Sequence, residues 1–531
     1  MGDAKRKALA RQSQTIAVDT FGGRIHVEWD PAAAVTPLGQ LPIFIEFLKV
    51  SGLFDAWVAD CPLTYRSNNA PDKREVLATF LLSILAGHHR YAHITAIRHD
   101  GIHPDLLGVA QLVSEDAARR ALAKMDESSG VAWLDRHLAK TTQPLLSTPW
   151  ILDLDATVKC LYGKQEGALV GYNPKKPGRP SHCYHSALIA NTRLALAVEV
   201  MAGNETAPTH SMPGIWAWLD ALPKAQRPAL LRGDLAYGSE SVLREAEVRD
   251  QPYLTKLRLT RNVKGLIKRL FCQGGWEDAG QGWEGLEDTL TLSGWSRARR
   301  VAVLRRKLTG EMLLTGKDER QSEFAFIEGD IPTARYEYAV LVTSTAYPIV
   351  SLAQLYRDRA DAENNFDELK NQWGWGGFTT QDLARCRLMA RMVALVYNWW
   401  TLFVRLAQPH KHFEAISSRP LLLHGVATQT RHAGQTRLTI TSTHAKQSTI
   451  QAILTNLAAF LTSLKATGLT PNHCRRSSPA RSPNSCSRQR RHPSCQGRIC
   501  VQADASTAVF RLNASSRRLR LPSETPNACK S

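Results

Sequence analysis

Four residues in the second half of the chain combine one carboxylate with two cations and a phenol at regular spacing. They are Tyr356, Arg359, Glu363 and Lys370, at offsets of 0, 3, 7 and 14. At 3.6 residues per turn, these offsets lie on one stripe of an α-helix. A carboxylate binds hard metal ions, while cations and a phenol bind phosphate oxygens. The stripe therefore predicts a site that handles a polyanion with the help of a divalent metal.

Two aspartates upstream could complete this site. Asp155 lies in WILDLDATVKC, whose alternation predicts a β-strand, and Asp234 closes the apolar run PALLRGD. Two carboxylates on adjacent strands and one on a helix would form an oxygen-rich cage for two Mg²⁺ ions, which together promote phosphodiester displacement. Crowded carboxylates repel each other, so the cluster requires cations. Asp153 points to the same side of the strand as Asp155, and periodicity does not choose between them.

The order Asp, Asp, Glu, with Tyr-x2-Arg-x3-Glu-x6-Lys around the glutamate, resembles the DDE transposases of bacterial insertion sequences. The segment DLDAT resembles the first aspartate motif of that family, and RGDLAYGS resembles the second. The resemblance covers about residues 36–465. It implies an RNase H-like catalytic domain with a β-strand insertion between the second aspartate and the glutamate, and residues 272–345 fit that position.

The resemblance also implies roles for six side chains. Those that bind the catalytic metals, two Mg²⁺ ions with Mn²⁺ as a substitute, are Asp155, Asp234 and Glu363. Those that hold DNA phosphates near the cut are Tyr356, Arg359 and Lys370. The family pattern places its first aspartate just before a small residue and Thr, which favours Asp155 over Asp153.

Two basic segments could contact DNA. Lys175, Lys176 and Arg179 lie in the loop NPKKPGRP after the first aspartate, where they could bind phosphates. The short segment SEDAARRALAKM predicts a helix with Ser114 as its N-cap, and Arg119 follows on that helix. A helix of this kind suits DNA-binding modules. The alternative for both segments is a solvated surface.

The insertion carries three tryptophans. In related hairpin-forming transposases, a tryptophan of the insertion stacks on a flipped base, which makes Trp276, Trp283 and Trp295 candidates. Ordinary packing is the alternative for each of them.

Alternating strand-like and helix-like runs after Pro149 indicate an α/β core. We therefore expect an α/β protein whose catalytic domain is an RNase H-like mixed sheet with a β-rich insertion, preceded by a helical DNA-binding region. The expected segments are 1–145 (mainly helical, DNA-binding), 146–271 (catalytic core, first part), 272–345 (β-rich insertion), 346–410 (catalytic core, second part, with the glutamate helix), 411–470 (C-terminal helical region) and 471–531 (basic tail).

The formal net charge of +19 favours a polyanionic partner, of which nucleic acid is the commonest. The sequence contains no run of eighteen apolar residues, so a membrane-spanning helix is not expected. The charged N-terminus does not resemble a secretory signal. The ten cysteines form no CxxC pair, which argues against a zinc site and a disulfide framework. We expect a cytoplasmic, nucleoid-associated bacterial protein. The composition of the Ser/Arg-rich tail predicts that it is disordered. The alternative is that the tail is a scrambled end, such as a shifted reading frame would produce.

The sequence thus predicts a DNA transposase that cleaves DNA at transposon ends and transfers strands into target DNA, with Mg²⁺. Its expected partners are double-stranded DNA at the terminal inverted repeats, target DNA, and a second copy in a homodimeric synaptic complex, with no membrane partner. The alternatives are a metal-dependent nuclease without strand transfer and a catalytically inactive DNA-binding derivative.

Overall fold

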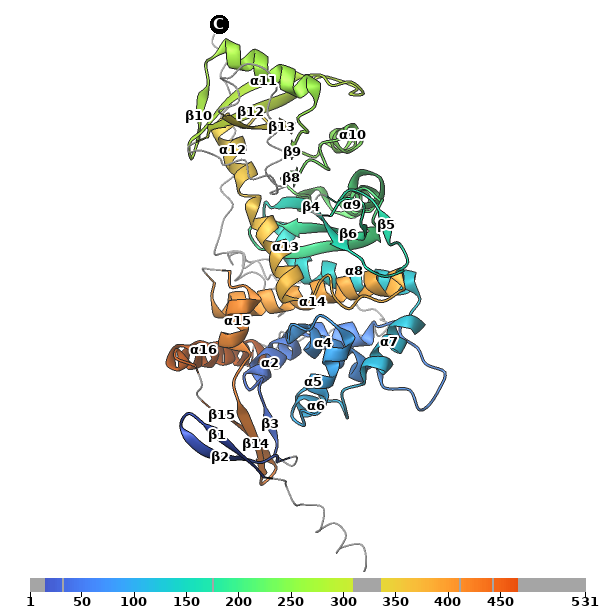
Figure 1. Ribbon diagram of the computed structural model, residues 1–531, viewed down its shortest axis with the longest axis vertical. Helices are drawn as coiled ribbons and strands as arrows, with labels where there is room; N and C mark the ends of the chain where they lie inside the picture. The colour runs from blue at the N-terminus through green and yellow to red at the C-terminus, as the bar shows by residue number, and fades with distance from the viewer. Residues whose placement is uncertain are drawn as a thin grey trace, which may run out of the picture.

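The computed structural model of the chain describes residues 15–30, 33–173, 176–308, 336–409, 412–441 and 444–466. Figure 1 shows an elongated molecule in which the main sheet and the N-terminal helices lie on opposite sides of helix α14. Lys175 and the tail 471–531, for which predictions were made above, lie outside the described residues. Within these ranges, no helix has both the length and the apolar character needed to cross a membrane.

Ten strands of the described chain form one mixed sheet. They are β4 (Ile151–Cys160), β5 (Leu169–Val170), β6 (Pro180–Ile189), β7 (Leu194–Ala202), β8 (Leu230–Gly233), β9 (Tyr253–Lys256), β10 (Glu277–Gly280), β11 (Trp283–Leu290), β12 (Arg299–Lys307) and β13 (Tyr336–Thr343). The core order is β7–β6–β4–β8–β9, with β4, β8 and β9 parallel and β6 and β7 antiparallel. The predicted class, an α/β protein with an RNase H-like mixed sheet, is confirmed.

The predicted insertion is β-rich, and its strands continue the central sheet instead of forming a separate one. β13 pairs antiparallel with β9, and β12, β11 and β10 follow in order beyond it. Val301, Val303, Val340 and Val342 are buried at this junction, because β12 and β13 present alternate apolar side chains to a covered face. The insertion therefore forms one edge of the sheet that carries the aspartates.

Helices cover the sheet and form the N-terminal region. Those before the sheet are α2 (Leu41–Ser51), α3 (Leu53–Ala59), α4 (Lys73–Leu85), α5 (Thr95–Arg98), α6 (His103–Leu107), α7 (Glu115–Lys124) and α8 (Glu127–Thr142). Those after β7 are α9 (Met212–Ala221), α10 (Glu240–Val248), α11 (Arg261–Gln273), α12 (Ile349–Arg357), α13 (Ala360–Gln372), α14 (Leu383–Ala407), α15 (Ala415–Leu422) and α16 (Gln447–Ala466). The predicted Ser114 cap is confirmed, because its hydroxyl accepts a hydrogen bond from Ala117 N.

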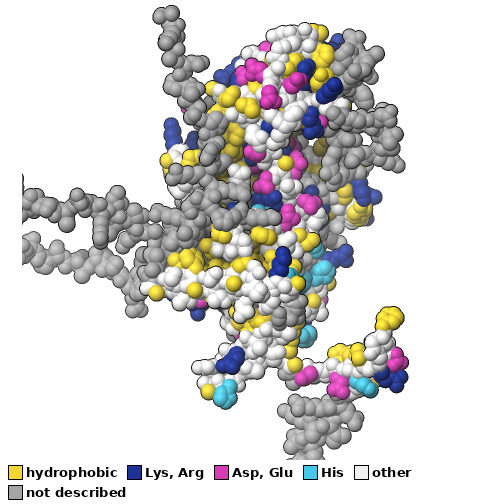
Figure 2. Space-filling model, turned by 90° about the vertical axis from the view of Figure 1, so that its left-hand side faces the viewer, with side chains coloured by type: hydrophobic (Ala, Val, Ile, Leu, Met, Phe, Trp, Pro, Cys, Tyr) yellow, Lys and Arg dark blue, Asp and Glu magenta, His cyan; other side chains and the backbone are white. Residues whose placement is uncertain are grey.

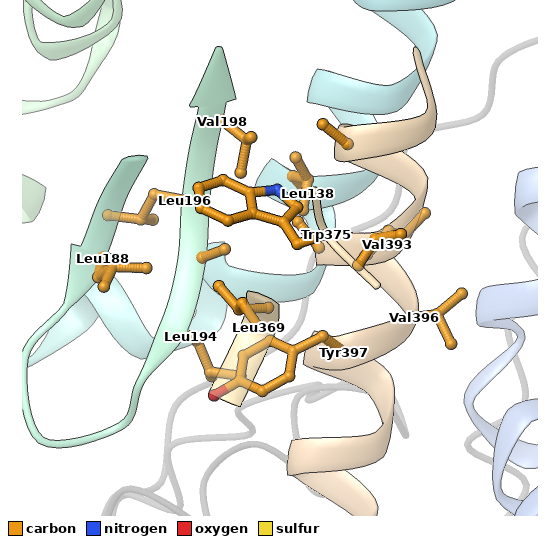
Figure 3. Packing of buried hydrophobic residues seen from close by; sticks show 14 of the residues in the cluster. Leu138, Leu188, Leu194, Leu196, Val198, Leu369, Trp375, Val393, Val396 and Tyr397 are labelled. Atoms are coloured by element: carbon orange, nitrogen blue, oxygen red, sulfur yellow. The ribbon is translucent and has the colours of Figure 1, made fainter. Parts of the chain in front are cut away.

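The long apolar helix α14 connects the two halves of the molecule. It contacts β7 and α8 on the sheet side, and α2, α4 and α16 on the other. Figure 3 shows Trp375 between Leu196 and Val198 of β7 and Val393 of α14, with Leu369 of α13 close by. This continuous burial fixes the N-terminal helices against the sheet.

One local expectation differs from the structure. The region 411–470, expected to be helical, contains α15 and α16 but also a hairpin of β14 (Ala427–His432) and β15 (Gln435–Ile440). β14 pairs with β3 (Val35–Thr36), so an N-terminal strand completes this small sheet. A separate hairpin, β1 (Ile16–Thr20) and β2 (Gly23–Val27), precedes it. Thr-rich alternation in ATQTRH and QTRLTI is the strand signal that the helical reading overlooked.

His185 on β6 gives the fold a measurable pH dependence. It is buried, and neither ring nitrogen has a hydrogen-bond partner among the described residues. Burial lowers the pKa of His185 from 6.5 to about 4. Between these values the unfolded chain holds a proton that the folded chain lacks, so stability is complete above pH 6.5 and decreases as the pH falls towards 4.

The free energy of unfolding should fall between pH 7 and pH 5, and we expect this fall to be about 2 kcal/mol smaller in His185→Gln than in the wild type. Urea unfolding of wild type and variant at both pH values measures the difference. Replacing the exposed His432 by Gln is the matched control and should leave the decrease unchanged. An identical decrease in wild type and His185→Gln would contradict the expectation.

Candidate active site

The parallel pairing of β4 and β8 brings the two predicted aspartates to the same end of the sheet. Leu154 pairs with Gly233, so Asp155 and Asp234 each stand one residue further along neighbouring strands. Neighbouring strands lie about 4.8 Å apart, which makes these two backbone positions adjacent. Asp155 is buried, whereas Asp234 is half-buried where the chain leaves β8, and its Oδ1 accepts a hydrogen bond from Ala236 N at 2.9 Å.

The helix that carries the glutamate approaches the same end of the sheet. The single helix expected to carry the stripe is divided into α12 and α13 by a tight turn at Asp358 and Arg359. There Arg359 N bonds to Tyr356 O at 3.1 Å, an i to i−3 contact that shortens the turn. α12 packs on β9–β12 and α13 packs on β4, as Figure 1 shows. The glutamate stripe therefore spans two helices rather than one.

Arg359 connects the acidic residues. Its Nη2 lies 2.9 Å from Asp155 Oδ2, and its Nη1 lies 3.6 Å from Glu363 Oε1. The Arg359 side chain is buried, while the side chain of Glu363 is 69% exposed. The structure thus places Asp155, Asp234 and Glu363 around one guanidinium at the end of β4 and β8.

Asp153 has a different environment from Asp155. Both of its carboxylate oxygens accept hydrogen bonds from Arg232, at 2.6 Å to Nε and 2.6 Å to Nη2, and both side chains are buried. Arg232 also donates to the carbonyl of Leu355 in α12. A bidentate, buried pair of this kind occupies the carboxylate fully. The geometry therefore assigns Asp153 to fixing α12 on the sheet and leaves Asp155 at the acidic cluster.

Burial dominates the electrostatics of the cluster. Desolvation raises the pKa of Asp155 to about 6, although the neighbouring Arg359 opposes the shift, and the charges of Asp234 and Glu363 add to it. Burial likewise raises the pKa of the Tyr356 hydroxyl, with smaller contributions from the same three carboxylates. Tyr356 precedes Arg359 by three residues, at the turn between α12 and α13. A cation placed here would stabilise the ionised form of Asp155.

The donor chemistry of the cluster fits a hard divalent cation. Asp155, Asp234 and Glu363 offer carboxylate oxygens, the ligands that Mg²⁺ prefers. Among the described residues, no three His, Cys, Asp or Glu side chains already converge as a complete ligand set. Arg359 lies between Asp155 and Glu363, and it supplies the positive charge that such a cluster needs. The residues therefore fit a metal site whose third carboxylate turns inward from α13.

The remaining residues of the stripe lie on either side of Glu363. Tyr356 is half-buried in α12, and Lys370 is half-buried near the end of α13. Lys370 Nζ donates to the hydroxyl of Thr157, two residues after Asp155 on the same face of β4. Lys370 is thereby oriented along the strand that carries the first aspartate.

The predicted basic loop lies elsewhere on the surface. Lys176 Nζ donates to the hydroxyl of Tyr162 at 2.6 Å, and the Arg179 guanidinium lies 4.7 Å from the centre of the same ring. Both cations are exposed, and neither lines the cleft described next. Their contact with DNA stays a prediction.

Arginines cover the candidate tryptophans of the insertion. The Arg305 guanidinium lies 3.9 Å from the ring centre of Trp276, and Arg306 and Arg299 lie 5.0 and 4.8 Å from the ring centres of Trp283 and Trp295. Cation–π packing of this kind stabilises the β extension. Base stacking by these rings stays a prediction.

A cleft of about 650 Å³ opens beside the cluster, and sequence reasoning did not identify it. It lies between the N-terminal region, represented by His89–Ala92 and Arg119, and the core, represented by β4, α13 and residues 375–379. Lys159 of β4 is the lining residue that could have been predicted from the sequence. It continues the alternation of Asp153, Asp155 and Thr157 by one further step.

Residues 146–399 match the family model described as the transposase DDE domain. No curated protein matches the chain. Among solved structures, the chain is similar to the cryo-EM structure of the piggyBac transposase synaptic complex with hairpin DNA. The identity is 10%, the TM-score is 0.34, and the similarity covers 85% of this chain and 87% of that chain. The family match covers both aspartates and the glutamate. Residues 146–399 of the chain therefore form a transposase DDE domain, the domain of enzymes that cleave and join DNA.

Proposed function

We propose that the chain cleaves DNA at transposon ends and transfers the freed strand into target DNA, with Asp155, Asp234 and Glu363 as the metal-binding residues. The observation that carries the proposal is the placement of Asp155 and Asp234 on adjacent strand ends, with Glu363 tied to Asp155 through Arg359. Members of this family use divalent metal ions. Mg²⁺, with Mn²⁺ as a substitute, suits these carboxylates best.

Two bound ions would activate the attacking oxygen and stabilise the leaving oxygen at the scissile phosphate. The chain's own residues position the DNA. Arg359 and Tyr356 stand beside the carboxylates, where a guanidinium and a phenol can hold the phosphate oxygens. Lys370 and Thr157 extend the same face of β4 away from the cut. Arg359 pairs with Asp155 and Glu363 without metal, and it would be available to a phosphate if these carboxylates held ions instead.

DNA is the macromolecular partner of a transposase. We propose that the partners are, more specifically, the terminal inverted repeats, target DNA, and a second copy of this chain that bridges two ends. The N-terminal region 1–145 and the cations Lys175, Lys176 and Arg179 are proposed to bind DNA outside the cut. Action on chromosomal DNA fits the cytoplasm and nucleoid of a bacterium.

The test uses purified chain, Mg²⁺, and labelled duplex DNA that contains the junction between the flanking DNA and the end of the element. We expect nicking at the end of the element, followed by joining of the new 3′ end to a supercoiled plasmid. Omitting Mg²⁺ should abolish both products and leave DNA binding intact.

The same assay distinguishes the alternatives. Cleavage without joined product would indicate a nuclease that lacks strand transfer. DNA retention without cleavage, with either Mg²⁺ or Mn²⁺, would indicate a binding protein that has lost catalysis. Either result would overturn the proposal.

A further inference from the structure

The cleft beside the acidic cluster is cationic and has a buried aromatic floor. Four of its lining residues are Lys or Arg, and none is Asp or Glu. The cations are Arg90, Arg119, Lys159 and Lys370. Tyr184, Trp375 and Phe378 form its buried floor. A cleft with charges of one sign attracts an anionic ligand.

Close backbone contacts fix the two walls of this cleft against each other. Phe378 N donates to His89 O at 2.7 Å across the junction. A Cβ atom at Gly374 or Gly377 would collide with the backbone oxygen of His88 or His89, so only glycine permits this approach. The cleft is therefore a built feature at the junction of the N-terminal region and the core.

The cleft begins where the acidic cluster ends. Asp155, Thr157 and Lys159 alternate along one face of β4, so Thr157 lies about 7 Å and Lys159 about 13 Å along the strand from Asp155. Lys370 contacts Thr157 from α13, the helix that carries Glu363. A strand held at the cluster would therefore pass directly into the cleft.

Lys159 is a half-buried cation of the cleft. Its Nζ donates to the hydroxyl of Thr379, and no carboxylate within the described ranges forms an ion pair with it. An ammonium has three donors, so donors remain after the bond to Thr379. Burial without a counter-ion lowers the pKa of Lys159 to about 8. Keeping an ammonium in this position is costly unless an anion joins it.

The size of the cleft selects the form of DNA. A sphere of the same volume would be about 11 Å across. The major groove, which is only one part of a DNA duplex, is already about 12 Å wide. A duplex cannot enter, whereas one unpaired strand can. Outside the cleft, Figure 2 shows Lys, Arg, Asp and Glu side chains interspersed over the upper part of one face, with no broad area of one sign.

We infer that this cleft binds the backbone phosphate of an unpaired DNA strand next to the scissile phosphate, through Lys159, Lys370 and Arg119. The inference rests on the proposed function, because it takes the strand from the acidic cluster. It adds Lys159 and Arg119 to the DNA-binding residues. It also gives the N-terminal region a direct part in holding the reacting strand.

The test measures binding without metal, so that cleavage does not enter. The probes are a labelled duplex with a short oligothymidylate arm and the same duplex without the arm. We expect the wild type to prefer the armed probe. Lys159→Gln and the exposed Arg119→Gln should each bind it about fivefold more weakly near 0.1 M salt, with a salt slope shallower by about 0.7. Lys224→Gln, at the opposite end of β8, should match the wild type.

A second experiment uses a probe whose single-stranded arm carries neutral methylphosphonates in place of phosphates. The wild type should bind it more weakly than Lys159→Gln binds the phosphate arm, because all three cations lose their phosphate. Lys159→Gln should distinguish the charged and neutral arms less strongly than the wild type does. Arg119→Gln keeps the test decisive if Lys159→Gln does not fold. Wild-type affinity and slope in the folded variants would overturn the inference. So would the absence of any preference for the armed probe. Loss of the proposed function would instead appear as normal binding of both probes with no cleavage after Mg²⁺ is added.

Discussion

Replacing Asp155 by Asn is expected to lower the rate of DNA-end cleavage by about 10³-fold or more. The substitution keeps the shape of the side chain but removes the charge that binds a cation. Metal-ion stabilisation of the reacting phosphate is worth several kcal/mol, and each 1.36 kcal/mol corresponds to about a tenfold change in rate. Asp153, on the same face of β4, has both carboxylate oxygens bound by Arg232, so it is not available to replace Asp155. Single-turnover cleavage with saturating enzyme and Mg²⁺ measures the effect.

The readouts of Asp155→Asn separate chemistry from folding. Arg359 retains Glu363 and the Leu154 carbonyl as partners in the variant, so the loss of unfolding free energy should be smaller than for Asp153→Asn, and cleavage is measured at a temperature where the variant is folded. DNA binding without metal should be equal to wild type or tighter, because a negative charge is lost near the phosphates. A variant that retains a tenth or more of the wild-type cleavage rate would exclude Asp155 as a metal-binding residue.

Replacing Asp153 by Asn is expected to act on stability instead, lowering the free energy of unfolding by about 3–5 kcal/mol. The change leaves the Arg232 guanidinium buried, with the Leu355 carbonyl as its remaining described partner. Breaking a buried ion pair from one side is costly because the other charge stays desolvated. Urea unfolding measures the loss. Cleavage by the fraction that remains folded should stay far above that of Asp155→Asn.

A double variant provides the control for this second prediction. Asp153→Leu combined with Arg232→Met removes both charges and keeps similar volumes, so much of the lost stability should return. Recovery identifies the ion pair, rather than the shape of either side chain, as the cause. If Asp153→Asn unfolds at the wild-type urea concentration but abolishes cleavage, Asp153 is the first catalytic acid and the assignment of Asp155 is wrong.

Much of the central architecture could be predicted because its signals are local. Alternation in WILDLDATVKC predicts β4, and the apolar run that ends at Asp234 predicts β8. Parallel neighbours end at the same side of a sheet, so the meeting of the two aspartates follows from these two strands. The spacing of Tyr356, Arg359 and Glu363 predicts that they share one face, and this relation survives the tight turn between α12 and α13.

What could not be predicted depends on contacts distant in the sequence. Periodicity cannot separate Asp153 from Asp155, because the difference comes from Arg232, 79 residues away on β8. The cleft is equally non-local, because Arg119 and Lys159 meet only when the N-terminal helices dock on the sheet. The break at Asp358 and Arg359 carries neither Gly nor Pro, so no local signal announces it.

The continuation of the central sheet into β10–β13 affects the order in which a newly made chain becomes competent. α12 rests on these strands, and Arg357 anchors it through the carbonyl of Ala279, 3.0 Å from Nη2. The aspartate strands leave the ribosome first, but Glu363 is aligned only after the extension has folded beneath α12. A nascent or truncated polypeptide that ends before α13 therefore carries the two aspartates without Glu363.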